Sequence, residues 1–490
     1  MVSPDTKVRA RIAPSPTGTL HLGTARTALY NYLFARNHHG AFILRLEDTD
    51  ETRSKEEYTQ DILAGLKWLG INWDEGPDIG GPHPPYRQTQ KIDHYSNMAN
   101  TLISKGLAYL AYETAEELEG LREQQKSDGH SPRYDNRGRT HSAEEIAHFE
   151  HEGRIPSIRF RIDEPQVVSW HDAIKGEISV DAADLGGDMV IVKSNGVAVY
   201  NFAVVVDDID MKMTHVIRGE DHIHNTAKQL LLYEALGHEP PVFGHVPLIH
   251  DSEHRKLSKR FHGEAVHVDQ YRIDGYMPEA MVNYLAQMSW TPPDERELFT
   301  LEQGCELFDL GKVSKSAAVF DVPKLNWFNG HYIRSLPLSV VTDRALPFLQ
   351  EYDLSEFNRE QLEQMVGSVR EGLTVLKEIT EAVKFYCETK LVVPEDLRTE
   401  QLCTEKAKLV LERTLNELKT MPWGDGPGCK AVVDKFGKEL GIKGKELYWP
   451  LRAALSAKLQ GPDMGSMISV LGEKRVRARL EAALDLCNSA

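Results

Sequence analysis

The chain has 490 residues, which is more than one ordinary hydrophobic core holds, so we expect two to four domains. Its 41% hydrophobic and 27% charged residues are typical of a globular protein, and no apolar run is long enough to span a membrane. The net charge of −17 excludes a nucleic-acid partner held by a uniformly basic surface. Such a partner would need local basic patches, and the candidates, each equally typical of a solvated surface, are residues 131–139, 430–445 and 473–479.

The five cysteines are scattered between Cys305 and Cys487 and contain no CxxC pair. This spacing argues against a disulfide framework and against a thiolate zinc site, and it favours a reducing compartment. The first residues, MVSPDTKVRARI, lack the apolar segment of a signal peptide. We therefore expect a cytoplasmic protein that does not bind a membrane.

Strand and helix patterns alternate over the first 70 residues. Two apolar runs, 8–12 and 41–48, predict strands, and the stretches 21–36 and 55–70 predict helices. This βαβα order predicts a parallel sheet with crossover helices. The loop that follows, residues 74–88, is rich in glycine and proline and marks a break.

Residues 90–190 differ in character and predict an insertion within the α/β domain. Short charged helices are followed by strand patterns at 157–162 and 188–200, and the second of these contains a Ser-Asn-Gly hairpin turn at 194–196.

The α/β domain resumes near residue 195. FAVVVDD at 202–208 and THVIRGED at 214–221 predict parallel strands, and a helical pattern follows at 224–237. After residue 325 helical patterns such as 362–386 dominate, so we expect an all-helical C-terminal third.

The stretch RIAPSPTGTLHLGTAR leads from the first predicted strand into the first predicted helix. Unpaired backbone amides at a helix N-terminus attract phosphate. Gly18 and Gly23 would let a ligand approach the backbone, two prolines stiffen the turn, and His21 can present an N–H to a phosphate oxygen. The alternative is a helix cap with an incidental histidine, but the surrounding APSPTG favours a phosphate site.

A second cationic segment, KLSKR at residues 256–260, lies in a stretch with little apolar periodicity and predicts a mobile loop. A loop of this kind can close on a triphosphate and stabilise the charge that develops there during reaction. Basic loops are common on protein surfaces, so this interpretation depends on the presence of the phosphate-site motif in the same chain.

Together these motifs carry a resemblance to a known family. APSPTGTLHLGT resembles the HIGH signature of class I aminoacyl-tRNA synthetases, and KLSKR resembles their KMSKS loop. RLEDTD, HPPYRQ, VVDDIDMKMTHVIRGEDH and LNWFNGHYIR extend the match. From about residue 7 to 480, the chain is similar to bacterial-type glutamyl-tRNA synthetases.

The fold class implied by this resemblance is α/β, with a Rossmann-type parallel-sheet catalytic domain, an inserted α+β acceptor-binding domain and an all-α anticodon-binding region. The implied boundaries are 1–89 and 195–249 for the catalytic domain, 90–194 for the insertion, 250–325 for a stem-contact region with the KMSKS-like loop, and 326–382 and 383–490 for two anticodon-binding subdomains. The resemblance further implies ligation of L-glutamate to tRNA-Glu through glutamyl-adenylate, with ATP and Mg²⁺ and by a monomer.

The resemblance also implies roles residue by residue. It implies catalytic roles for His21, Gly23, Lys256 and Lys259. It implies ATP contacts for Pro14, Gly18, His21, Thr24, Asp221, Ser258 and Lys259. It implies glutamate contacts for Arg11, Ala13, Ser15, Glu47, Tyr200 and Arg218. The planar fork of arginine suits a carboxylate and Glu47 would face the α-amino group, but which arginine takes which carboxylate stays open.

Two metal questions arise from the same region of the chain. Asp207, Asp208 and Asp210 are either ligands of Mg²⁺ or structural residues, and the sequence leaves both readings open. Some relatives hold zinc with cysteines in the insertion, but residues 90–190 contain no cysteine, so we expect no structural zinc.

The choice of tRNA depends, in this family, on an arginine in the anticodon region. Alignment on the LKE triplet places Gly372 at that position, with Arg370 close enough to confuse the register. A glycine side chain cannot supply a discriminating hydrogen bond, so we expect that tRNA-Gln is charged as well. The alternatives are a paralogue that glutamylates a modified base on tRNA-Asp, which lacks an anticodon region, and a non-catalytic tRNA-binding paralogue.

Overall fold

The computed structural model describes residues 7–50 and 52–488, except the side chains of residues 259, 260 and 488. The described residues form two compact units. The first unit, Met1–Tyr271 with Met281–Asp321, contains the strands, and the second unit, Arg272–Ala280 with Val322–Ala490, is helical. No helix within the described ranges is both long and apolar enough to cross a lipid bilayer.

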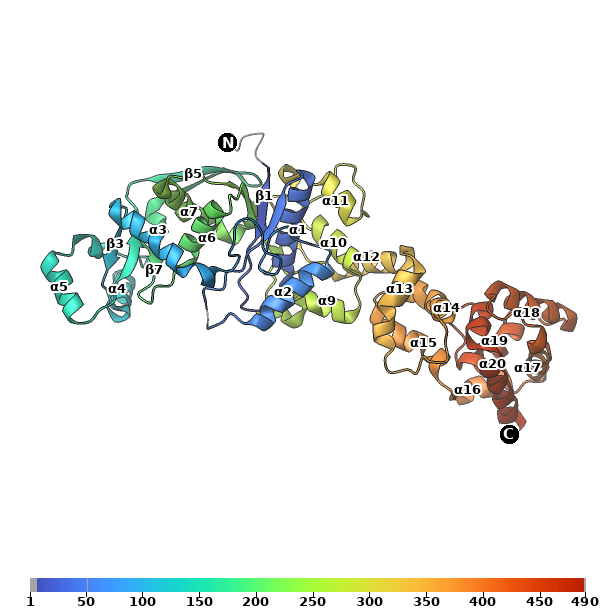
Figure 1. Ribbon diagram of the computed structural model, residues 1–490. Coiled ribbons are helices and arrows are strands. Elements are labelled where there is room, and N and C mark those ends of the chain that lie inside the picture. Colours follow the sequence, from blue (N-terminus) through green and yellow to red (C-terminus); the bar gives the residue numbers. More distant parts are fainter. Residues whose placement is uncertain (1–6, 51, 489–490) are drawn as a thin grey trace. The chain divides into compact units, whose positions relative to one another are not determined.

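Two parallel strand pairs form the centre of the first unit, and one helix connects the strands of each pair (Figure 1). The elements are β1 (Arg9–Ile12), α1 (Leu22–Asn37), β2 (Ala41–Leu44), α2 (Glu56–Trp68), β8 (His215–Gly219), α7 (Ile223–Leu236) and β9 (Val242–Val246). The two pairs meet where Thr214 N donates to Arg9 O at 3.0 Å. β2 is buried along its whole length, as expected for a parallel strand covered on both faces. The predicted βαβα unit is therefore confirmed.

Residues 90–194, the predicted insertion, contain a three-stranded antiparallel sheet and a separate hairpin. The sheet has the order β3 (Ala108–Ala111), β4 (Ser157–Phe160) and β7 (Met189–Val192), and the hairpin pairs β5 (Val167–Asp172) with β6 (Gly176–Asp181). Its helices are α3 (Ile92–Ser104), α4 (Ala115–Ser127) and α5 (Ala143–His151). Thr114 and Ser142 form capping boxes at the starts of α4 and α5, which fix where these exposed helices begin.

Two strand predictions in this region are wrong. FAVVVDD belongs to α6 (Tyr200–Asp210), because a short apolar run that is buried on most sides has the same pattern in a helix as in a strand. The turn at 194–196 does form, since Lys193 N donates to Val197 O at 2.9 Å. Beyond the turn, the chain pairs back through an isolated bridge between Val192 and Ala198 and a hydrogen bond from Val199 N to Ile191 O at 2.9 Å, before α6 begins.

The rest of the first unit and its junction with the second consist of short elements. They are β10 (Ile249–His250), α8 (Lys259–His262), α9 (Val268–Asp274), α10 (Pro278–Gln287), α11 (Leu301–Leu307) and β11 (Ala318–Val319). β10 and β11 pair in parallel, and Leu257 N donates to Ile249 O at 2.8 Å. This pairing holds residue 257 beside the end of β10.

From residue 325 on, the described chain contains helices and no strand, which confirms the predicted helical C-terminal third. The helices are α12 (Val322–Ser335), α13 (Leu338–Ala345), α14 (Arg359–Val369), α15 (Ile379–Cys387), α16 (Glu395–Leu397), α17 (Glu405–Glu417), α18 (Gly426–Leu440), α19 (Lys445–Ser456) and α20 (Met464–Asn488). The helical pattern at 362–386 is interrupted between α14 and α15, where two 3₁₀ turns replace the α-helix.

One cysteine expectation needs correction. Cys403 and Cys487 form a disulfide across 84 residues of sequence, with a Cα–Cα distance of 5.0 Å. Sequence spacing alone does not reveal that two distant cysteines come within disulfide reach.

Candidate active site

A cavity of about 530 Å³ opens where the carboxyl ends of β1 and β8 meet the start of α1. In parallel α/β sheets, ligands bind at this edge. The predicted site residues that line the cavity are Arg11, Ala13, Pro14, Ser15, His21, Gly23, Thr24, Glu47, Tyr200, Arg218, Asp221, Lys256 and Ser258. These residues come from five segments that are far apart in the sequence, and the fold brings them to one place.

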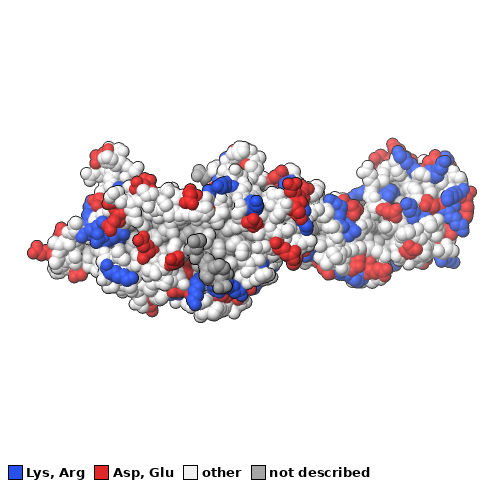
Figure 2. All heavy atoms as spheres, turned by 90° about the horizontal axis from the view of Figure 1, so that it is seen from above, with Lys and Arg blue, Asp and Glu red and all other residues white. Residues whose placement is uncertain are grey.

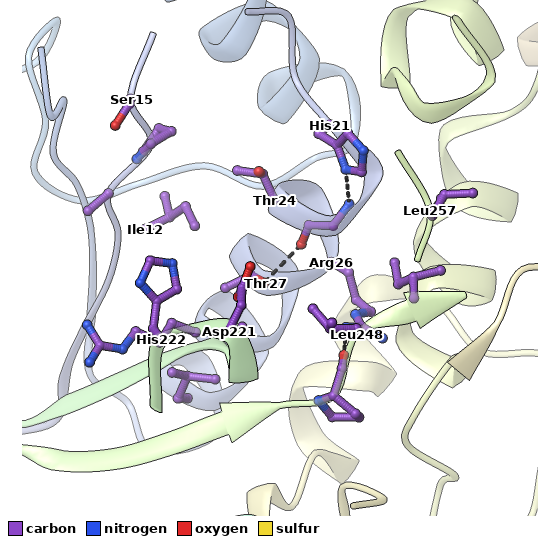
Figure 3. A pocket seen from close by; sticks show the side chains of 18 of the residues that line it. Ile12, Ser15, His21, Thr24, Arg26, Thr27, Asp221, His222, Leu248 and Leu257 are labelled. Carbon is purple, nitrogen blue, oxygen red and sulfur yellow. Dashed lines mark hydrogen bonds between the residues drawn. The ribbon is translucent and has the colours of Figure 1, made fainter. Parts of the chain in front are cut away.

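His21 caps the N-terminus of α1. Its backbone is extended, with φ −81° and ψ 145°, and its Nδ1 accepts a hydrogen bond from Gly23 N at 3.0 Å (Figure 3). Burial, together with the neighbouring His267 and Lys256, lowers the pKa of His21 to about 4, so the ring is neutral near pH 7. A neutral ring that accepts at Nδ1 carries its proton on Nε2. His21 therefore offers an N–H donor at the positive end of α1.

The predicted cationic loop borders the same cavity. Lys256 and Ser258 line it, and Lys256 Nζ lies 3.0 Å from Asp221 Oδ2. Although burial opposes ionisation, Lys256 and His222 hold the pKa of Asp221 below its usual value. The side chain of Lys259 lies outside the described residues, so its role stays a prediction.

Arg11 lines the cavity, and its positive charge is paired with the carboxylate of Asp208. Its Nε and Nη2 donate to the two carboxylate oxygens of Asp208 at 3.2 and 3.1 Å. Arg45 Nη1 donates to the same carboxylate at 2.6 Å. Burial opposes ionisation of Asp208, but the two arginines hold its pKa below the usual value. This cluster fixes the position of Arg11.

Arg218 has a different environment. Its side chain is 5% exposed, and no described carboxylate lies within ion-pair distance of it. Nη2 donates to Thr226 Oγ1 at 2.6 Å and to Gln229 Oε1 at 2.8 Å, and both acceptors are neutral. Burial lowers the pKa of Arg218, yet an arginine stays charged at neutral pH. A buried cation without a counter-charge at the wall of a cavity attracts an anionic ligand.

Glu47 and Tyr200 lie near the two arginines. Arg45 Nη2 donates to Glu47 Oε1 at 3.2 Å, while burial raises the pKa of the Glu47 carboxyl. Tyr200 OH lies 3.2 Å from His222 Nδ1. Burial and the nearby Arg218 lower the pKa of His222 to about 4, so its ring does not add a cation at neutral pH.

Sequence reasoning missed three polar residues of the cavity wall. Arg26 and Thr27 lie on α1, and His222 follows β8; all three are labelled in Figure 3. Arg26 donates to Pro247 O and, at 3.2 Å, to Ser289 Oγ. It thus ties α1 to the chain after β9. Arg26 ends the stretch GTAR, Thr27 follows it directly, and His222 ends the stretch GEDH. Only the spacing of these residues from His21 and Arg218 would have pointed to them.

Three predicted site residues lie outside this cavity. Gly18 precedes α1 and does not line the cavity, and a Cβ added there would meet no atom within 4 Å. Arg370 and Gly372 lie in the second unit, where they form the 3₁₀ turn η8 (Arg370–Gly372). Gly372 lines a separate cavity of about 410 Å³, together with Glu371 and Phe385.

The aspartates of α6 serve structural contacts. Asp207 accepts from Lys91 at 2.7 Å, Asp208 pairs with Arg11, and Asp210 accepts from Lys91 at 2.5 Å. Within the described residues, no group of three or more His, Cys, Asp and Glu side chains is arranged to hold a metal ion. The structural reading of these aspartates is therefore favoured, and the expectation of no structural zinc stays a prediction.

Comparison with known proteins gives the family. Residues 7–327 match the model described as tRNA synthetases class I (E and Q), catalytic domain, and residues 340–484 match the model described as anticodon binding domain. The chain is 43% identical to the glutamate–tRNA ligase of Carboxydothermus hydrogenoformans, over 96% of this chain and 99% of that protein. It is 45% identical to the glutamate–tRNA ligase of Natranaerobius thermophilus, over 99% of each.

A solved structure agrees. The glutamate tRNA ligase of Elizabethkingia meningosepticum, crystallised in complex with its amino acid, superimposes with a TM-score of 0.87 at 32% identity and covers 98% of this chain and 99% of that one. The resemblance inferred from the motifs is thus confirmed over nearly the whole chain. The chain belongs to the class I aminoacyl-tRNA synthetases, in the family of bacterial-type glutamate–tRNA ligases.

Proposed function

We infer that this enzyme ligates L-glutamate to tRNA-Glu in two steps. An oxygen of the glutamate α-carboxylate attacks the α-phosphorus of ATP and pyrophosphate leaves. A hydroxyl of the terminal ribose of the tRNA then attacks the carbonyl carbon of the adenylate, and AMP leaves. The observation that carries this inference is that the phosphate-site helix at His21 and the cationic loop at Lys256 line one cavity.

The phosphates of ATP, which would arrive with Mg²⁺, belong at the start of α1. There the Nε2–H of His21 can donate to a phosphate oxygen without the ring first losing a proton, because the ring is already neutral. Lys256 and, as we propose, Lys259 neutralise the charge that develops as pyrophosphate leaves. Gly23 and Asp221 both line the cavity, and we propose that Gly23 leaves room for the nucleotide beside the helix and that Asp221 contacts the adenosine.

Glutamate belongs at the arginine side of the cavity. We assign the side-chain carboxylate to Arg218, because its charge has no counter-charge, while Arg11 is already paired with Asp208. Glu47 would face the ammonium group, and Tyr200 lies within 3.5 Å of Arg218 Nη1, where its hydroxyl can also meet a carboxylate. This arrangement explains a preference for glutamate over glutamine, since a neutral amide would leave Arg218 poorly paired.

The tRNA would contact both units, with the acceptor end at the insertion and the anticodon at the second unit. Lys and Arg side chains gather over the end formed by α17 to α20, interspersed with acidic ones (Figure 2). In that region Lys430, Lys445, Trp449 and Arg452 line a cavity of about 350 Å³. Lys445 Nζ lies 4.6 Å from the centroid of the Trp449 ring. An aromatic ring flanked by cations suits an unstacked nucleobase and its phosphate.

The decisive experiment is glutamate-dependent ATP–pyrophosphate exchange and tRNA charging with purified enzyme. We expect exchange to require both glutamate and tRNA-Glu. A Lys259→Ala variant should lose most of the rate and keep tRNA binding. Arg36→Gln is the control, because Arg36 lies at the far end of α1, where it pairs with Asp74 and does not line the cavity. No charging of tRNA-Glu by the wild-type enzyme would contradict the inference.

We further propose that the enzyme charges tRNA-Gln. The two tRNAs differ at the third anticodon base, which is C in tRNA-Glu and G in tRNA-Gln, and Gly372 offers no side chain to read that base. Charging of both transcripts should be measured side by side for the wild type and for Gly372→Arg. A side chain can begin at this position, because no atom lies within 4 Å of the added Cβ. The wild type should charge both tRNAs, and the variant should lose tRNA-Gln first; a wild type that leaves tRNA-Gln uncharged defeats the proposal.

This protein is expected to act as a monomer in the cytoplasm, where ATP and tRNA are both supplied. Gel filtration with light scattering would test the monomer. The alternative on tRNA-Asp finds no support, since residues 340–484 match an anticodon binding domain.

A further inference from the structure

A chain of hydrogen bonds runs from Arg218 to the insertion. Arg218 Nη2 donates to Thr226 Oγ1 at 2.6 Å, Thr226 Oγ1 lies 2.9 Å from His245 Nε2, and His245 Nδ1 lies 2.5 Å from Asp172 Oδ2. Arg218 Nε also points to His245 Nε2, at 3.4 Å. All four side chains are buried, and those of His245 and Asp172 have no exposed surface. Asp172 is the last residue of β5, so the predicted insertion supplies the end of the hydrogen-bond chain that lies farthest from Arg218.

The two oxygens of Asp172 have separate tasks. Oδ1 accepts three backbone amides, from His245 at 3.1 Å, Ile174 at 3.0 Å and Lys175 at 2.8 Å. Within the described part of the chain, the hydrogen-bond partner of Oδ2 is the ring of His245. Burial opposes ionisation, but His245 and these amides hold the pKa of Asp172 below its usual value, so it is a carboxylate at neutral pH.

These contacts fix the proton on His245. A carboxylate only accepts hydrogen bonds, so His245 Nδ1 carries the proton. Burial lowers the pKa of His245, so the ring is neutral and Nε2 has a free lone pair. The Thr226 hydroxyl has two acceptors within reach, this lone pair at 2.9 Å and His222 O at 3.2 Å. We assign its proton to the shorter contact, so that the Thr226 oxygen accepts from Arg218. The guanidinium is thus oriented by a neutral ring, and its positive charge is left for a ligand.

We propose that Asp172 and His245 are positioning residues of the glutamate site, which set the tautomer that orients Arg218 without neutralising it. The proposal rests on the proposed function, in that Arg218 takes a carboxylate of glutamate. It assigns to the insertion a part in amino-acid binding, in addition to the proposed part in tRNA binding.

Asp172→Asn tests the proposal with little change of shape. The amide oxygen can keep the three backbone hydrogen bonds of Oδ1, which leaves the amide NH₂ facing His245 Nδ1. That NH₂ would donate to Nδ1 and move the ring proton to Nε2, where it opposes the Arg218 Nε–H and turns the Thr226 hydroxyl from His245 to His222 O, 3.2 Å away. We expect the KM for glutamate to rise roughly 10- to 100-fold, as for a buried donor that loses its acceptor. The KM for ATP should stay within about twofold.

The tautomer gives a readout that a purely structural role would not move. In ¹⁵N spectra of the histidine rings, with the His245 signals assigned by their loss in His245→Asn, the wild type should show the Nδ1–H form and Asp172→Asn the Nε2–H form. Asp181→Asn is the matched control, because Asp181 also ends a strand of this hairpin and accepts the backbone amide of Ala183. Its kinetics and spectrum should equal those of the wild type.

Thr226 provides a second pair of variants that leaves the backbone contacts of Asp172 intact. Thr226→Val removes the hydroxyl and should raise the KM for glutamate as Asp172→Asn does, while Thr226→Ser keeps the hydroxyl and should restore it. This pair decides the question if Asp172→Asn fails to fold.

Two results would overturn the proposal and leave the proposed function standing. One is that Asp172→Asn and Thr226→Val both keep the wild-type kinetics for glutamate. The other is that the KM for ATP and the KM for glutamate increase equally. If the wild type does not use glutamate, the proposed function fails, and the tautomer change alone still tests the Asp172–His245 pair.

Discussion

Arg11 and Arg218 line one cavity, but they differ in how much positive charge they leave for a ligand. Arg11 donates two hydrogen bonds to the Asp208 carboxylate. The four hydrogen-bond partners of Arg218 are neutral side chains, those of Tyr200, Thr226, Gln229 and His245. A carboxylate can accept two charge-assisted hydrogen bonds from Arg218 in a bidentate contact, whereas an amide has one oxygen to accept them and carries no charge. Selectivity for glutamate is therefore expected to depend on this one residue.

The first prediction concerns Arg218→Gln. The variant removes the cation and leaves an amide that can pair with glutamine as well as with glutamate. We expect kcat/KM for glutamate to fall about 10³-fold or more, with a smaller fall for glutamine, because sites built around a polar partner discriminate by roughly 10⁴-fold. Both amino acids should be assayed by pyrophosphate exchange with tRNA present. Arg218→Lys keeps the charge without the fork and should lie between; an unchanged preference in Arg218→Gln would refute the assignment.

The second prediction concerns pH and a histidine outside the active site. Burial, with a contribution from His38, lowers the pKa of His215 to about 4, against about 6.5 in an unfolded chain. Between these values the unfolded state binds more protons, so this contribution to stability is complete above pH 6.5 and is lost as the pH falls toward 4. His215→Asn removes the titrating ring and keeps a donor near Thr214 Oγ1.

The measurement is the thermal midpoint at pH 7.0 and at pH 4.5. The wild type should lose more stability between the two than His215→Asn does, whatever the carboxylates contribute to both. His148→Asn, at an exposed position of α5, should behave as the wild type. An equal loss in His215→Asn would show that the ring does not titrate in this range.

At the scale of elements, the sequence was informative where local chemistry decides the structure. The β1–α1–β2 unit followed from apolar runs, a capping histidine and the glycine-rich mouth of α1. The error at α6 arose because Phe202–Val206 are all buried, and a uniformly apolar segment shows neither periodicity. The contact of Asp172 with His245 could not be inferred either, since nothing local links residues 73 positions apart.

The third prediction tests the packing of this unit at two glycines. A Cβ on Gly40 would lie 2.4 Å from Val8 O and 2.8 Å from Val8 Cβ, so Gly40→Ala must displace backbone where α1 leads into β2. We expect a loss of about 1–3 kcal/mol, read from the urea midpoint. Gly18→Ala faces open space and should change stability by less than about 0.5 kcal/mol.

Gly18→Ala also tests whether the nucleotide site at the N-terminus of α1 extends to residue 18. Because Gly18 does not line the cavity, Gly18→Ala should keep the KM for ATP of the wild type. A large rise would show that the nucleotide reaches Gly18, and equal stability of the two variants would contradict the contact at Val8.

At the scale of the whole molecule, composition predicted the broad class and the need for local basic patches, but it could not show where a site forms. Arg11, Tyr200, Arg218 and Lys256 span about half the chain, and periodicity gives no reason for them to meet. The family resemblance supplied that information, because the known site of the family already includes residues that only the fold brings together. The charge balance of Arg218 was visible only in the folded structure, where its hydrogen-bond partners are neutral and no described carboxylate lies within ion-pair distance.

The last prediction separates a local patch from the total charge of −17. Lys445→Gln and Lys406→Gln change the net charge of the enzyme equally, and both lysines lie in the second unit. Only Lys445 lines the cavity with Trp449, whereas Lys406 pairs with Glu446 at 2.8 Å. If Lys445 meets one phosphate of the anticodon loop, its loss should weaken tRNA binding and reduce the slope of log Kd against log salt by about 0.7, the value for single-stranded contacts.

Fluorescence titration of tRNA at several salt concentrations measures both quantities. Lys406→Gln should leave the slope unchanged, because a lysine already paired with a carboxylate releases few counterions from the tRNA. Equal effects of the two substitutions would mean that the tRNA senses the overall field of an acidic protein. The basic cavity of α18 and α19 would then carry no part of the binding, and the tRNA would have to be held by other surfaces.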